Sequence, residues 1–124
     1  MSHYTMVKTQ ITDVSALEKA VKELGYELLR NTEPRGYYRG RTCDFVVRLR
    51  GPYDVGLVRE KNGTYTLTAD WWGGHVEREL GKGAQRLLQE YGVQKTVLEA
   101  RRKGYSVYRQ QLQDGTVKLI LRGF

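Results

Sequence analysis

The feature that most constrains this fold is the dipeptide Asn62-Gly63, which lies between two segments of strand-forming residues, 55–61 and 64–70. Asn-Gly is a preferred centre for a two-residue β-hairpin turn, because both residues tolerate positive φ. The two segments are therefore expected to pair as antiparallel strands. A two-residue turn would pair Val58 with Leu67 and Glu60 with Tyr65, and would place Val58, Tyr65 and Leu67 on one face, the predicted core side.

A second signal of the same kind, Asp114-Gly115, lies between segments 105–113 and 116–124. In the later segment Val117, Leu119 and Leu121 alternate with Lys118, Ile120 and Arg122. A period of two is the pattern of a β-strand, so a second antiparallel hairpin is expected at the C-terminal end.

A helix is expected after Thr12-Asp13. Apolar residues recur there at intervals of three and four, on one helical stripe: Val14, Leu17, Val21 and Leu24. Asp13 or Ser15 can cap its first turn, and Gly25 follows its last one. This is the clearest element of the chain.

The remaining segments complete an α+β pattern. Strands are expected over 4–11, 26–30 and 43–50, and helices over 76–91 and 93–103, separated by Gly92. The predicted fold is a single domain over residues 1–124, with an antiparallel-rich sheet and two or three helices mainly on one face. The expected order of elements is β-α-β-β-β-β-α-α-β-β.

Composition narrows the class of protein further. Hydrophobic residues make up 40% and charged residues 28%, which is typical of a globular chain. The apolar runs are too short to span a bilayer, and the N-terminus lacks the pattern of a secretory signal, so no membrane association and a cytoplasmic location are expected. The single cysteine, Cys43, excludes an internal disulfide and is expected to be a small buried residue.

The net charge of +7 favours anionic partners, and one segment concentrates it. Between residues 30 and 50 the chain has six arginines, against Glu33 and Asp44, with two tyrosines interleaved. Guanidinium groups bind phosphate in a bidentate manner, and tyrosine rings can stack on bases. The candidate contact residues are Arg35, Tyr37, Tyr38, Arg39, Arg41, Arg48 and Arg50. The alternative is that these arginines only solubilise one sheet face, or pair with carboxylates from elsewhere in the chain.

The pair Trp71-Trp72 is the second candidate contact feature. Adjacent strand residues point to opposite faces, so one tryptophan is expected in the core and the other partly exposed. An exposed tryptophan favours a protein contact or a stacking platform, whereas a covered loop would give it no such role.

The sequence contains no complete motif for catalysis or cofactor binding. His3 and His75 have no acidic or thiol cluster at ligand spacing, so no metal site is predicted. Gly81-Lys82-Gly83 lacks the length and the Lys-Ser/Thr pair of a phosphate-binding loop. No catalytic residue and no cofactor are predicted, although an undescribed small enzyme stays open.

Both ends of the chain carry a resemblance. The segment Met1 to Gly25, with Val7-Lys8-Thr9-Gln10-Ile11 and Leu24-Gly25, and the segment Tyr91 to Leu119, with Tyr91-Gly92, Gly104-Tyr105 and Asp114-Gly115-Thr116, are matched in the same order. They resemble a family of short uncharacterised proteins, a domain of unknown function found in cyanobacteria, red-algal plastids and other bacteria. The resemblance implies a one-domain fold, a stromal location in the algal relatives and no active site.

Three functional hypotheses follow. The first is a non-enzymatic adaptor or assembly factor that binds another protein through exposed aromatic residues and the arginine-rich face. The second is binding of RNA or single-stranded DNA through the arginines and tyrosines named above. The third is a small enzyme. The oligomeric state stays open in all three.

Overall fold

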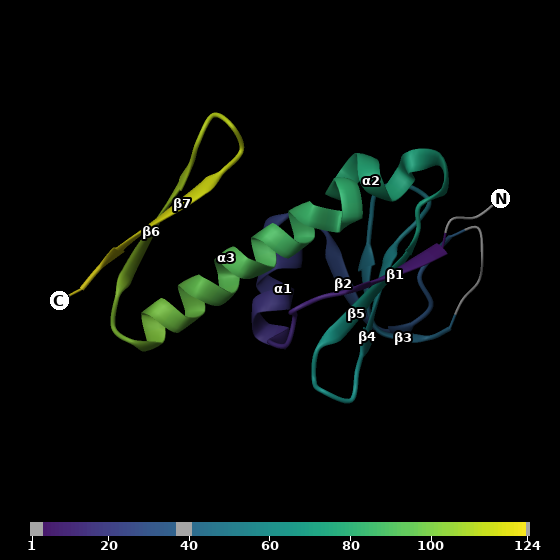
Figure 1. Ribbon diagram of the computed structural model, residues 1–124, viewed down its shortest axis with the longest axis horizontal. Coiled ribbons are helices and arrows are strands. Elements are labelled where there is room, and N and C mark those ends of the chain that lie inside the picture. Colours follow the sequence, from purple (N-terminus) through teal and green to yellow (C-terminus); the bar gives the residue numbers. More distant parts are fainter. Residues whose placement is uncertain (1–3, 37–40, 124) are drawn as a thin grey trace.

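The computed structural model describes residues 4–36 and 41–123 and has the α+β architecture and the order of elements expected (Figure 1). Its strands are β1 (Tyr4–Lys8), β2 (Glu27–Thr32), β3 (Cys43–Arg48), β4 (Val55–Arg59), β5 (Tyr65–Asp70), β6 (Ser106–Gln111) and β7 (Val117–Arg122). Its helices are α1 (Val14–Glu23), α2 (His75–Leu80) and α3 (Gln85–Arg102), with short 3-10 turns η1 (Trp72–Gly74) and η2 (Lys82–Ala84).

Five strands form one antiparallel sheet in the order β1-β5-β4-β3-β2. The helices pack on one of its faces, as expected, and the core lies between the two layers (Figure 1). Apolar side chains that alternate along β3, β4 and β5 meet those of α1, α2 and the first half of α3. Fully buried members include Leu17, Val47, Leu57, Leu67, Leu80 and Leu87.

The β4–β5 hairpin has a three-residue loop, so the register predicted for it is wrong by one residue. Leu57 lies opposite Leu67, and Val58 lies opposite Thr66. The loop Lys61-Asn62-Gly63 closes with the amide of Glu60 donating to the carbonyl of Thr64, and Gly63 takes a φ of 88°. A shift of one residue turns a strand over, so Val58 lies on the face opposite the core.

The start of α1 is fixed from two sides. The side chain of Asp13 accepts a hydrogen bond from the amide of Ala16, which confirms Asp13 as the N-cap. The hydroxyl of Tyr91 on α3 accepts from the amides of Thr12 and Asp13, each at 3.0 Å. These bonds tie the two helices together at the amide groups that a helix start leaves unpaired.

The helical region 75–102 breaks at a different place from the one predicted. Helix α3 runs without interruption through Gly92, and the break lies at residues 81–84. Gly81, Gly83 and Ala84 all adopt positive φ, which ends α2 and redirects the chain into α3. A glycine inside a helix costs only about 1 kcal/mol, and the packing of α3 on α1 outweighs it.

The last two strands form a separate antiparallel hairpin, β6–β7, beside α3. Its loop, Gln113-Asp114-Gly115, also has three residues, with Leu112 donating to the carbonyl of Thr116. Figure 1 shows α3 between this hairpin and the five-stranded sheet, so the hairpin does not extend the main sheet.

Candidate functional site

The predicted arginines Arg35 and Arg48 share one buried carboxylate, that of Asp54. The Asp54 side chain is fully buried, and its oxygens accept from Nε and Nη2 of Arg35 and from Nε of Arg48. The amides of Arg35 and Leu49 donate to it as well, at 2.9 and 3.1 Å. Hydrogen bonding to Asp54 raises the pKa of Arg35. The two arginines therefore add about one net positive charge to the surface instead of two.

This cluster fixes a loop across the sheet. Nη2 of Arg35 also donates to the carbonyls of Leu49 and Gly51, and the amide of Asp54 donates to the carbonyl of Arg35. The neighbouring Pro34 is buried and lies against Gly56 of β4, on the sheet face opposite the helices. The bonds to Asp54 thus hold segment 33–36 on that face.

The other arginines of the segment lie apart from this cluster. Arg50 stacks on the ring of Tyr26, 5.0 Å from its centroid, and its amide donates to Glu79 on α2. Arg30 pairs with Glu18 on α1 and lies over the ring of Phe45. Arg41 is exposed, and Tyr37, Tyr38 and Arg39 lie outside the described residues. Among the described arginines of residues 30–50, only Arg35 and Arg48 therefore share a carboxylate, that of Asp54.

The tryptophan pair divides as expected. Trp71 packs against the hydrophobic core, whereas Trp72 is 42% exposed. Trp71 follows β5 directly and Trp72 begins the turn η1, so their separation comes from the start of the turn and not from strand alternation. The ring of Trp72 lies 6.2 Å from that of His75, whose other side meets Tyr53 at 4.9 Å.

The β6–β7 hairpin carries most of the exposed apolar surface, and the sequence prediction missed it as a site. Five of the seven exposed large hydrophobic side chains in the described part of the chain belong to it: Tyr105, Tyr108, Leu112, Ile120 and Leu121. These five residues are named the hairpin surface below. The signal for it lay in β7, where apolar residues occur on both faces of a strand. Large contiguous patches of exposed apolar groups mark sites of interaction.

A buried ion pair anchors the hairpin on α3. Arg109 of β6 donates to both carboxylate oxygens of Glu90, each at 2.6 Å, and the Glu90 side chain is 6% exposed. Burial acts to raise the pKa of Glu90, but the hydrogen bonds from Arg109 and Gln94 outweigh it, and the net pKa is lowered. The pair orients the hairpin by a bidentate contact.

Two hollows flank the contact between hairpin and helix. A hollow of about 160 Å³ lies between α1, α3 and β6, with Val93, Val97 and Val107 in its lining. A second hollow, of about 490 Å³, separates the loop residues Asp114 to Thr116 from the start of α3. The half-buried side chains on the same face of the hairpin as Arg109 are Val107, Val117 and Leu119.

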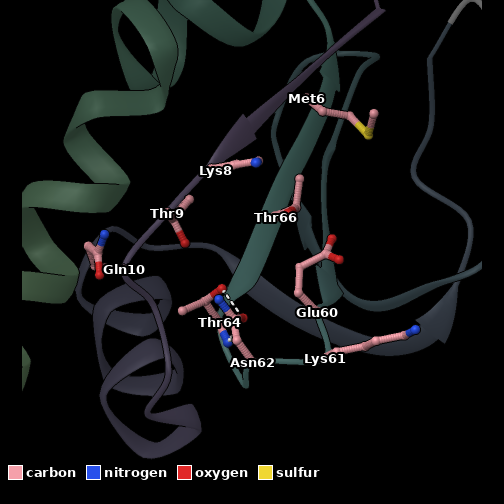
Figure 2. A pocket seen from close by; sticks show the side chains of 9 residues that line it. All are labelled: Met6, Lys8, Thr9, Gln10, Glu60, Lys61, Asn62, Thr64 and Thr66. Atoms are coloured by element: carbon pink, nitrogen blue, oxygen red, sulfur yellow. Dashed lines mark hydrogen bonds between the residues drawn. The ribbon is translucent and has the colours of Figure 1, made fainter.

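A further hollow, of about 770 Å³, lies beside β1 and the β4–β5 loop (Figure 2). Figure 2 shows side chains of both charges around it, including Lys8, Glu60 and Lys61. The hydroxyl of Thr9 is already bonded to the carbonyl of Tyr65 and the amide of Ile11. Because side chains of both charges line this hollow, its lining favours neither an anionic nor a cationic ligand.

Thiol and metal chemistry find little support in residues 4–36 and 41–123. Cys43 is buried, as expected, and burial raises the pKa of its thiol. Within those ranges no three His, Cys, Asp or Glu side chains come together as a metal site. No helix of the described residues is long and apolar enough to cross a membrane.

Comparison with known proteins assigns the family. A family described as a protein of unknown function, DUF1257, matches residues 20–120, from the middle of α1 into β7. The chain belongs to this family. The match includes strands β2 to β5 of the main sheet and the hairpin surface up to Ile120, whereas β1 precedes it. It confirms the resemblance to this family.

Two curated relatives are similar along nearly their whole length. An uncharacterized protein ycf35 of Cyanophora paradoxa is 28% identical over 98% of this chain and 97% of the relative. The ycf35 protein of Pyropia yezoensis is 26% identical, with the same coverage. No solved structure matches. Neither relative carries a described activity in its name.

Proposed function

We propose that this protein is a non-enzymatic adaptor or assembly factor that acts by binding another protein through the hairpin surface. The observation that supports it is the concentration of exposed apolar side chains on a two-stranded hairpin outside the main sheet. A two-stranded hairpin is at best marginally stable alone, and the ion pair of Arg109 with Glu90 joins this one to the rest of the fold. Covering its apolar side chains with a partner would stabilise it.

Site-specific photocrosslinking tests the proposal. A photoreactive p-benzoylphenylalanine is introduced at Tyr108, and at Lys61 in a matched control, in cells that naturally make the protein. Lys61 is also exposed but lies in the β4–β5 loop, away from the β6–β7 hairpin. We expect a discrete protein adduct from position 108 that survives nuclease treatment and does not form from position 61. Absence of a protein adduct from position 108 would contradict the proposal.

Binding of RNA or single-stranded DNA is the second candidate, because Arg41 is exposed beside the tyrosine-rich segment. Against it, Asp54 already engages Arg35 and Arg48, and Arg50 stacks on Tyr26. If five phosphate contacts formed, the logarithm of the binding constant for a single strand would fall with the logarithm of salt concentration at a slope of about −3.5. A filter-binding titration with labelled RNA measures this slope, and a slope near zero removes this candidate.

A further inference from the structure

A second concentration of positive charge, besides that of residues 30–50, lies on the hairpin and the end of the helix before it. Residues 101–123 contain six lysines and arginines and one aspartate, a net charge of +5 out of +7 for the whole chain. Three of these cations, Arg101, Arg102 and Lys103, end α3, where they complement the helix dipole. The other three lie on the hairpin itself.

One face of the hairpin combines this charge with exposed apolar groups. The face that points away from Arg109, named the outer face, consists of Ser106, Tyr108, Gln110, Lys118, Ile120 and Arg122. Tyr108 and Ile120 lie opposite each other and are 54% and 36% exposed. Lys118 and Arg122 flank Ile120 on β7, each about 7 Å along the strand from it. The outer face is thus an apolar pair between two cations, with no acidic side chain.

We propose that the outer face binds an acidic protein segment, which places a large apolar side chain on Tyr108 and Ile120 and carboxylates against Lys118 and Arg122. This inference rests on the proposed function and adds the chemistry of the partner. Complementary charge at the rim of an apolar contact speeds association and excludes wrong partners. Tyrosine and arginine are also the residue types that carry most binding energy at protein interfaces.

The same features disfavour other occupants. A second copy would bring one +5 segment against another, which like-charge repulsion opposes. Nucleic acid would need several open aromatic faces, whereas Tyr108 is the single aromatic residue of the outer face and Arg122 already lies over one face of its ring, at 5.3 Å. Of the other exposed groups, Leu112, Ile120 and Leu121 are aliphatic and offer no stacking surface, and Tyr105 precedes β6 and is not part of the outer face.

A random 12-residue peptide library displayed on phage tests the inference on the full chain. It is selected on the wild-type protein, and the enriched peptides are then titrated by fluorescence polarisation. We expect enriched peptides with net negative charge and at least one large apolar residue. The double variant Lys118→Glu/Arg122→Glu should weaken their binding by about ten-fold or more, and Tyr108→Ser by a similar factor.

The matched control is Lys61→Glu/Lys82→Glu, which changes the net charge equally at two exposed lysines away from the outer face. It should retain binding to within about three-fold, and circular dichroism should show all variants folded. Enrichment of neutral or basic peptides, or equal weakening in the control, would overturn the inference. The inference would also be overturned if the wild-type chain dimerised, or bound RNA or phosphatidylserine vesicles, through Lys118 and Arg122.

The two proposals fail differently. An adduct from position 108 with a partner segment that is not acidic leaves the proposed function intact and removes only this inference. Absence of any protein adduct from that position removes both.

Discussion

Removing the charge of Asp54 is expected to destabilise the fold more than any other single change of charge. The carboxylate is fully buried and accepts from two guanidinium groups and two backbone amides. The variant Asp54→Asn keeps the shape of the side chain but replaces one acceptor oxygen with an NH2 group, which cannot accept a hydrogen bond from these donors. Breaking a buried ion pair from one side costs about 3 to 5 kcal/mol. Because each arginine side chain is 41% exposed and can be rehydrated, the expected cost lies at the lower end, about 3 kcal/mol.

That cost converts into a measurable shift in melting temperature. With an unfolding entropy of about 2.1 cal/mol/K per residue, a chain of 124 residues loses about 4 °C of Tm for each kcal/mol. We therefore expect Tm to fall by about 12 °C. Thermal unfolding followed by circular dichroism measures this shift, and a urea titration checks the loss in free energy of unfolding. Arg35→Gln should cost more than Arg48→Gln, because Arg35 also donates to the carbonyls of Leu49 and Gly51.

The control is Glu18→Gln, which removes a carboxylate of the same charge from an exposed ion pair with Arg30. It should lower stability by at most about 1 kcal/mol, or about 4 °C. If Asp54→Asn shifts Tm by no more than this control does, the carboxylate does not organise the loop and the reasoning is refuted.

Three further outcomes are expected. Glu90→Gln should increase hydrogen exchange in β6–β7 but not in the main sheet. Because the pKa of Glu90 is lowered in the folded state, its stabilisation should be complete above about pH 4.5 and lost as pH falls further; equal protection factors of the β6–β7 amides at pH 3 and pH 7, after correction for intrinsic exchange, would argue against this. Gly56→Ala would put a methyl group 2.5 Å from Sγ of Cys43 and should cost about 1 to 3 kcal/mol in urea unfolding, whereas Gly92→Ala, with open space around it, should stabilise by about 0.5 to 1 kcal/mol. The buried Cys43 thiol, with its raised pKa, should react with Ellman's reagent only after unfolding, and fast reaction of the native protein would contradict this.

The sequence predicts those parts of the fold that local patterns determine. The stripe of α1, its Asp13 cap and the order of strands and helices follow from periodicity and turn residues. Loop length does not, because Asn62-Gly63 fits both a two-residue turn and the last positions of a three-residue loop. That ambiguity of one residue placed Val58 on the wrong face.

The candidate site depends on contacts that are distant in sequence. The sequence leaves open that the arginines pair with carboxylates elsewhere in the chain, but no sequence pattern near Arg35 identifies Asp54, 19 residues away, as that carboxylate. The break of the helical region at Gly81 to Ala84, and not at Gly92, likewise reflects the packing of α3 on α1. The hairpin surface was missed because exposure is visible only once β6 and β7 are known to lie outside the main sheet.

Helix α3 has a consequence for how this family can vary. Its 18 residues span about 27 Å, and its members of the buried core, Leu87 and Tyr91, lie in its first half, while Leu98 packs against that core from the second half. Substitutions in the terminal strands can therefore accumulate without disturbing that core, provided that the Glu90 and Arg109 contact survives. Relatives could in this way exchange one binding specificity for another while inheriting the same scaffold.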